Sequence, residues 1–195
     1  NNDMKRIIAY STLSQLGYMF VAAGLGAYWV ALFHLAAHAF FKSVLFLGAG
    51  NVMHAMDDEL DIRKMGGLHN KMKATSIIMA VASLALAGIF PLAGFFSKDK
   101  ILEATFNADA IMLWAVLWVT AGLTAFYSFR LVMKIFFGKQ NYSNEEFHPH
   151  EAKSFVIVAM IPLAILAVIA GWFEHSFVEF VTKLLPTWEA TNLSH

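Results

Sequence analysis

Three titratable side chains at four-residue intervals are the feature of this chain most suggestive of chemistry. His34, His38 and Lys42 lie within an apolar stretch, residues 28–53, that is long enough to cross a bilayer. A four-residue step returns to nearly the same face of a helix, so the two imidazoles and the amine form one polar row. A charge at membrane depth costs about 2.5–3.5 kcal/mol. Proton transfer is the function that best explains keeping it there.

Other interpretations of this row remain open. Lys42 could snorkel to the membrane surface or form a structural salt bridge, although a lysine side chain reaches only a short way from the middle of a span. His34 and His38 could join helices through hydrogen bonds, or hold zinc, which two histidines one turn apart can do. The third metal ligand on this helix would be Lys42, a poor one. We therefore favour a proton relay.

A second candidate site follows a helix-breaking sequence. Lys98 and Asp99 lie in the segment GFFSKDKILE, residues 94–103. This cluster could be a loop on the outer surface, but enough residues remain before the turn at 107–109 to keep Lys98 inside the membrane on a helix. Ser97 is a plausible N-cap for that helix. We expect Lys98 to be a second titratable site and Asp99 to be a carboxylate that modulates it.

Composition identifies the class of protein in which these residues act. Hydrophobic residues make up 58% of the 195 residues and charged residues only 14%, against about 25% in soluble domains. The formal net charge is zero, which gives no basic face for nucleic acid. The absence of cysteine excludes disulfides, thiolate metal sites and iron–sulfur clusters in this chain. The sequence therefore indicates an integral membrane protein without redox centres of its own.

The apolar runs predict an all-α, polytopic transmembrane bundle with five spans, at residues 7–26, 28–53, 74–106, 110–137 and 154–173. The third run is too long for one crossing and contains Pro91 and Gly94, which break helices. We expect two half-helices, 74–90 and 95–106, joined inside the membrane. Such a joint leaves backbone groups unpaired and must face protein or a wet cavity.

The distribution of cations predicts the orientation. Eight lysines and arginines lie on the side that carries the N-terminus and the loops 54–73 and 138–153: Lys5, Arg6, Arg63, Lys64, Lys71, Lys73, Lys139 and Lys153. The positive-inside rule places this side in the cytoplasm, or in the matrix of an organelle. After the last span, one face of the tail is apolar, which predicts a surface-lying amphipathic segment with Phe177, Phe180, Val181, Leu184 and Leu185.

Four segments of the chain resemble the antiporter-like subunits of respiratory complex I. They are KRIIAYSTLSQLGYM (residues 5–19), FHLAAHAFFK (33–42), KMGGL (64–68) and GFFSKDKIL (94–102). The resemblance covers about three quarters of the chain and weakens after Lys139. The Mrp-type sodium/proton antiporters share the general pattern. A lysine at position 98 resembles the distal, L-type members rather than those with glutamate there.

This resemblance implies roles for the residues singled out above. Lys42 would be the central relay lysine, and His34 and His38 would extend the polar axis through the membrane. Lys98, in the discontinuous helix, would be the terminal lysine linked to the outlet. Residues 1–137 would form most of the second of two inverted repeats, and 138–195 a cytoplasmic loop, one more transmembrane helix and an outer-side tail. The chain would be part of a subunit about three times as long.

The function that the resemblance implies is proton translocation as a subunit of NADH:quinone oxidoreductase, in a bacterial inner membrane or an organellar inner membrane. Flavin, iron–sulfur clusters and quinone would belong to partner subunits, with no cofactor in this chain. The partners would be other antiporter-like membrane subunits and the lipid bilayer, without nucleic acid. The alternatives are a subunit of an Mrp-type antiporter or an ion-pumping hydrogenase, or a purely structural membrane anchor.

Overall fold

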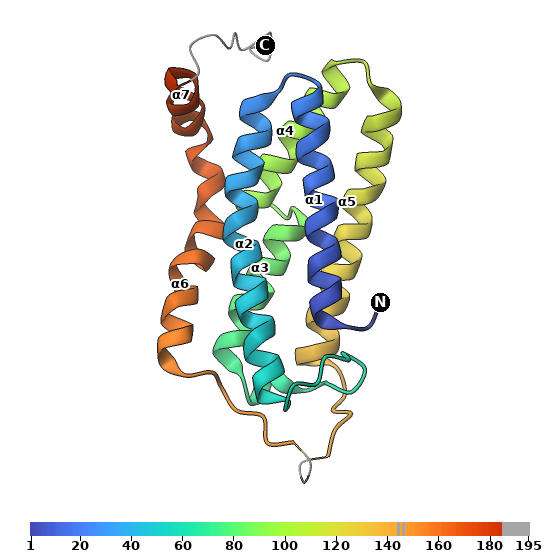
Figure 1. Ribbon diagram of the computed structural model, residues 1–195, viewed down its shortest axis with the longest axis vertical. Helices are drawn as coiled ribbons and strands as arrows, with labels where there is room; N and C mark the ends of the chain where they lie inside the picture. The colour runs from blue at the N-terminus through green and yellow to red at the C-terminus, as the bar shows by residue number, and fades with distance from the viewer. Residues whose placement is uncertain (144, 146, 185–195) are drawn as a thin grey trace.

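Long apolar runs separated by turns fold into a bundle of helices that lie alongside one another (Figure 1). The structure, a computed structural model, describes residues 1–143, 145 and 147–184, and every regular element in that part is helical. In chain order the elements are α1 (Met4–Gly24), α2 (Tyr28–Ala55), η1 (Leu68–Asn70), α3 (Lys73–Ala87), α4 (Ala93–Asn107), α5 (Ile111–Val132), the π-helical turn η2 (Met133–Phe137), α6 (Ser154–Ile169), η3 (Ala170–Phe173) and α7 (Glu174–Leu184). The predicted all-α fold is confirmed.

Five membrane crossings can be traced along the described chain. Four segments are each long and apolar enough to span a bilayer: Met4–Gly24, Tyr28–Ala55, Ile111–Phe137 and Ser154–Lys183. The fifth crossing is composite, because α3 and α4 have 15 residues each and α4 continues onward from α3 (Figure 1). Together they supply roughly 45 Å of helix, which exceeds the ~30 Å hydrocarbon core. The prediction of five spans, one of them discontinuous, is confirmed.

The break in the composite span begins earlier than predicted. We expected half-helices 74–90 and 95–106, whereas α3 ends at Ala87 and α4 begins at Ala93. Pro91 therefore lies in the short connection between them. The predicted boundaries were wrong by about three residues because they were placed around Pro91, whereas α3 ends before this residue is reached.

Two glycines shape this break. Gly88 ends α3 with a φ of +80°, a left-handed conformation in which glycine avoids the clash of a side chain. Its N–H donates to the Ala85 carbonyl at 3.0 Å, which closes the last turn. Gly94 lies in the first turn of α4, where a Cβ would fall 1.8 Å from the carbonyl oxygen of Ala85. The two half-helices are therefore in direct backbone contact.

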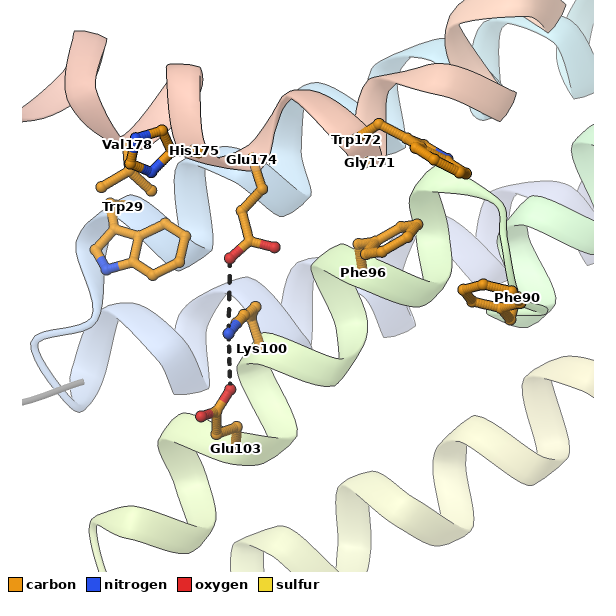
Figure 2. A pocket seen from close by; sticks show the side chains of 10 residues that line it. All are labelled: Trp29, Phe90, Phe96, Lys100, Glu103, Gly171, Trp172, Glu174, His175 and Val178. Atoms are coloured by element: carbon orange, nitrogen blue, oxygen red, sulfur yellow. Dashed lines mark hydrogen bonds and ion pairs between the residues drawn. The ribbon is translucent and has the colours of Figure 1, made fainter. Parts of the chain in front are cut away.

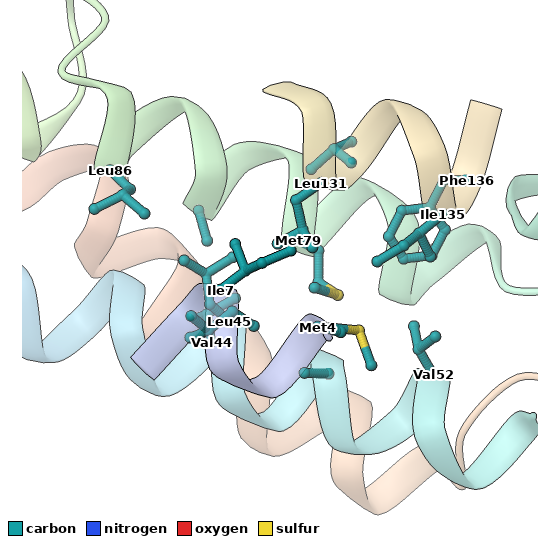
Figure 3. Packing of buried hydrophobic residues seen from close by; sticks show 14 of the residues in the cluster. Met4, Ile7, Val44, Leu45, Val52, Met79, Leu86, Leu131, Ile135 and Phe136 are labelled. Carbon is teal, nitrogen blue, oxygen red and sulfur yellow. The ribbon is translucent and has the colours of Figure 1, made fainter. Parts of the chain in front are cut away.

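Helix α2 lies at the centre of the bundle and packs against α1, α3, α4 and α6. Much of the main buried hydrophobic cluster surrounds the C-terminal half of α2. Figure 3 shows side chains from α1, α2, α3, α5 and η2 meeting there: Met4, Ile7, Val44, Leu45, Val52, Met79, Leu86, Leu131, Ile135 and Phe136. Between membrane helices such close packing is the main source of association, because lipid tails are as apolar as leucine.

The segment after the last span is helical, as its spacing predicted. In α7, Val181 is buried and Phe177 packs against Phe33 of α2, with ring centroids 5.4 Å apart. Phe180 is 60% exposed. Part of the predicted apolar face therefore packs against the bundle, and part of it is exposed. The side chain of Leu184 and the whole of Leu185 lie outside the described residues.

The two predicted loops and the N-terminus lie at the same end of the bundle, at the bottom of Figure 1. The chain start is joined to the first loop, because the Met4 N–H donates to the Leu60 carbonyl at 2.9 Å. Hydrogen bonds from Arg63 lower the pKa of Asp61 to about 2, so this loop carboxylate stays ionised at any physiological pH. The loop cations thus share one membrane face, as the orientation argument requires.

A carboxylate from the second loop caps the first half-helix. Glu151 Oε2 accepts hydrogen bonds from the backbone N–H groups of Ala74, at 2.8 Å, and Thr75, at 3.3 Å. Its other oxygen accepts from the Thr75 hydroxyl at 2.6 Å. The first N–H groups of a helix have no partner within it, and negative charge is favoured there. Glu151 therefore fixes loop 138–153 to the start of α3.

Replacing Glu151 by alanine is expected to loosen this end of the bundle without unfolding it. Loss of a capping side chain costs about 0.5–2 kcal/mol. We expect a lower melting temperature of the purified complete subunit and faster protease cleavage within loop 138–153. Glu145→Ala in the same loop is the matched control, because Glu145 is exposed, whereas the Glu151 carboxylate bonds the start of α3. Equal cleavage rates in the two variants would contradict the assigned capping role.

Candidate functional site

The row predicted on α2 is buried in the interior of the bundle. His34, His38 and Lys42 have exposed fractions of 0%, 6% and 5%. The His34 and His38 ring centroids are 6.3 Å apart, as expected for neighbours one turn apart on the same helix face. Snorkelling of Lys42 to solvent is excluded by this burial. These three side chains can therefore contact only neighbouring helices and small molecules that enter the interior of the bundle.

His34 is held from two sides by polar side chains. Its Nε2 lies 3.1 Å from Gln15 Oε1 on α1, and its Nδ1 lies 2.9 Å from Ser97 Oγ on α4. An amide oxygen can only accept, so Nε2 carries the proton and Nδ1 of the neutral ring accepts from the Ser97 hydroxyl. Both ring nitrogens are thereby engaged, which leaves neither free for the metal ion considered above.

Among the described residues, Lys42 forms its hydrogen bonds with α1. Its Nζ donates to the Ile8 carbonyl at 3.1 Å and to the Ser11 hydroxyl. The Ser11 hydroxyl in turn donates to the same carbonyl at 2.7 Å. The first half of α1 thus supplies the hydrogen-bond partners of the buried amine.

Lys98 is held by the end of the interrupted helix. It is 4% exposed, and its Nζ donates to the Leu86 carbonyl at 2.8 Å. The carbonyls in the last turn of a helix have no intrahelical donor and carry partial negative charge. The Lys98 Nζ also lies 5.7 Å from the centroid of the Tyr18 ring, within cation–π range. The break thus creates the binding site for this amine.

The two buried lysines have no carboxylate partner within the described part of the chain. All ion pairs there lie elsewhere, and neither Lys42 nor Lys98 belongs to one. Asp99, expected beside Lys98, is exposed on the outside of α4. The structure therefore brings Lys42, Lys98 and the two histidines into the interior and leaves Asp99 apart from them.

Several polar atoms in the interior of the bundle are buried without a hydrogen-bond partner among the described residues. They are Gln15 Nε2, His38 Nε2, Ser83 Oγ and Ser128 Oγ. Leaving a buried polar group unpaired costs about 1–3 kcal/mol, and ordered water is the usual remedy. The interior around the two histidines and α5 therefore has places where water could bind.

Sequence reasoning missed some of these partners and misplaced one. Ser97 was expected to cap the second half-helix, but it lies inside α4 and bonds His34 instead. Nothing in the sequence pointed to Tyr18 or to the Leu86 carbonyl. Gln15 appeared only within the segment of residues 5–19 that carries the family resemblance. His34, His38 and Lys42 are all buried on α2, while their contacts with other helices could be identified only from the structure.

Comparison with known proteins gives a consistent result. Residues 1–124 match the family described as NADH:quinone oxidoreductase/Mrp antiporter, transmembrane. NADH-quinone oxidoreductase subunit L of Campylobacter jejuni is 62% identical over 97% of this chain, and that of Rhodobacter capsulatus is 46% identical over 90%. The matched regions make up 31% and 26% of those proteins. The chain thus spans less than a third of the length of these relatives.

A solved structure is similar as well. A chain of the membrane-bound sulfane sulfur reductase, an archaeal respiratory membrane complex, superimposes with a TM-score of 0.80 at 31% sequence identity. The match covers 87% of this chain and 28% of the archaeal one. The helical arrangement described above is therefore shared with a subunit of a respiratory membrane assembly.

Proposed function

Because the chain belongs to the NADH:quinone oxidoreductase/Mrp antiporter transmembrane family, and is therefore part of an integral membrane protein, we propose that it conducts protons across the middle of the membrane. The path runs between Lys42 and Lys98 by way of His34 and His38. Redox chemistry takes place in partner subunits, and this chain supplies only the ion path. The flavin, iron–sulfur clusters and quinone belong to those partners.

One observation carries this proposal: two amines are buried in the interior of the bundle on neutral partners, and His34, on the helix of Lys42, is hydrogen-bonded to Ser97, which adjoins Lys98 on α4. Lys42 rests on the Ile8 carbonyl and Lys98 on the Leu86 carbonyl. Without a fixed counter-ion, the charge of each amine responds to its neighbours. A nearby positive charge favours the neutral amine, and a nearby carboxylate favours the ammonium. Changing these neighbours would load and release a proton.

His34 can pass a proton without moving far. A proton delivered to Nδ1 from the side of Ser97 would let Nε2 release its own proton toward Gln15. His38 has an unpaired Nε2 on the same face, one turn closer to Lys42. Water bound at the unpaired atoms of Gln15 and His38 would complete the path. Asp99 remains a proposed modulator that would act from the outer face of α4.

The wider assignment follows from the same premise. Residues 1–137 are proposed to form most of the second inverted repeat, and residues 138–195 a loop, a further span and a tail. The N-terminal end, with its excess of lysine and arginine, is proposed to face the cytoplasm of a bacterium, with the organellar matrix as the alternative. The partners are other antiporter-like membrane subunits, and the translocating enzyme is the assembled complex.

The proposal is tested by replacing Lys98 with alanine in the complete complex. Removing the amine of Lys98 removes roughly 1.5–3 kcal/mol of stabilisation of the proton in transit, which is the free energy of a hydrogen bond to a charged group. Conduction through this subunit should therefore slow about 10- to 100-fold. We expect fewer protons translocated per electron pair, with NADH-driven reduction of an artificial acceptor unchanged.

The same measurement includes a control variant and a test of which ion is transported. Lys183→Ala, at a side chain that is 72% exposed, should leave pumping at the wild-type level. Unchanged pumping in Lys98→Ala would contradict the relay. Sodium-dependent exchange that continues without NADH would assign the chain to the antiporter branch of the family instead.

A further inference from the structure

A pocket of about 610 Å³ opens on the bundle, and its lining residues are not those of the polar row. It lies between the start of α2, helix α4, η3 and the start of α7 (Figure 2). Its volume falls within the ~300–1,000 Å³ typical of small-molecule sites. None of the residues assigned to proton conduction lines this pocket. A ligand bound in it would therefore have a role other than proton conduction.

One end of the pocket is an aromatic wall. Phe96 packs against Trp172 and Phe90, with ring centroids 6.3 Å and 6.1 Å apart. The Trp172 Nε1–H donates to the Pro91 carbonyl at 3.2 Å, which fixes the indole against the break between α3 and α4. Phe90 and Trp172 are nevertheless 64% and 67% exposed. This wall is an ordered apolar surface without a cover in the described chain.

The other end of the pocket is charged (Figure 2). Lys100 lies between two carboxylates, with its Nζ 3.0 Å from Glu103 and 3.6 Å from Glu174. One cation between two anions leaves a net charge of about −1, and all three side chains are partly exposed. The carboxylates can therefore accept further hydrogen bonds from a cation that enters the pocket.

We propose that this pocket binds a zwitterionic phospholipid whose headgroup carries an ammonium. The ammonium lies on Glu103 and Glu174, the phosphate approaches Lys100, and an acyl chain lies along the wall of Phe96 and Trp172. This inference does not depend on the proposed proton conduction.

Depth and charge both favour this occupant. Lys100 lies seven residues before the end of α4 at Asn107, roughly 10 Å along the axis, and is two residues nearer to that end than Lys98. Trp29, the second residue of α2, lines the charged end, as tryptophan commonly does at the membrane–water boundary. The aromatic wall starts deeper, at the break. The excess negative charge disfavours an anionic lipid.

Photolabelling of the complete complex in vesicles tests the proposal. The probe is a phosphatidylethanolamine with a diazirine in its acyl chain, compared with the phosphatidylglycerol analogue in otherwise identical vesicles. We expect ethanolamine lipid to label peptides containing Phe90, Phe96 or Trp172 several-fold more strongly than the glycerol lipid. Labelling of the exposed face of α5, around Val116 and Val119, is the internal reference for bulk lipid.

Variants identify the headgroup site. Glu103→Gln and Glu174→Gln, separately, should reduce the preference for ethanolamine lipid at least twofold, whereas Glu179→Gln should not, because Glu179 pairs with Lys183 outside the pocket. Two separate variants keep the test usable if one of them impairs assembly. Equal labelling by both lipids, or no labelling at these peptides because a protein segment covers the wall, would overturn the proposal.

Discussion

Removing both buried lysines at once, Lys42→Ala with Lys98→Ala, is expected to close the proton path through this subunit. Without an amine to carry the charge, a proton in transit must be borne in hydrocarbon by water and histidine alone. A charge at that depth costs about 2.5–3.5 kcal/mol, which corresponds to a roughly 100-fold slower step. Proton release per electron pair in the reconstituted complex should fall below that of Lys98→Ala alone.

The electron-transfer activity distinguishes this outcome from misfolding. NADH-driven reduction of an artificial acceptor should stay at the wild-type level, because the redox groups are proposed to belong to partner subunits. A matched double variant, Lys5→Ala with Lys183→Ala, removes two exposed lysines and the same net charge. It should pump normally. Wild-type pumping by the Lys42/Lys98 variant would refute the relay and favour the structural-anchor hypothesis.

The part of the site that the sequence predicted is the part fixed by local helix geometry. His34, His38 and Lys42 are spaced so that any helix through them must present all three on one face. Burial of that face followed from the apolar residues around it. Leu86 could not be identified in this way, because its contribution is a backbone carbonyl freed by the end of α3. The partners Gln15 and Ser97 likewise depend on how α1 and α4 pack against α2.

The exposure of Asp99 could have been predicted from local helix geometry. Consecutive residues on an α-helix point about 100° apart, so an inward Lys98 turns Asp99 away from the same interior site. The structure has this arrangement, with Lys98 buried and Asp99 exposed. The position of the helix break was also accessible, because Gly88 is a typical helix C-terminal residue. The predicted boundary was instead placed next to Pro91, beyond Gly88.

Replacing Gly94 by alanine is expected to be among the most damaging single methyl additions in the described part of the chain. The new Cβ would lie 1.8 Å from the Ala85 carbonyl oxygen, and both groups are attached to helical backbone. Neither can rotate away, so α3 and α4 must separate. Such overpacking costs about 1–3 kcal/mol or more, a large share of a typical stability of about 5–15 kcal/mol.

The same displacement should reach the proton path, because Leu86 follows Ala85 and Lys98 lies one turn beyond Gly94. We therefore expect Gly94→Ala to lower both the melting temperature of the complete subunit and its proton conduction. Gly122→Ala on α5 is the matched control: no atom lies within 4 Å of its added Cβ. Alanine there should be neutral, or stabilising by up to ~1 kcal/mol through helix propensity. If the two variants melt at the same temperature, the backbone contact between the half-helices does not hold the break together.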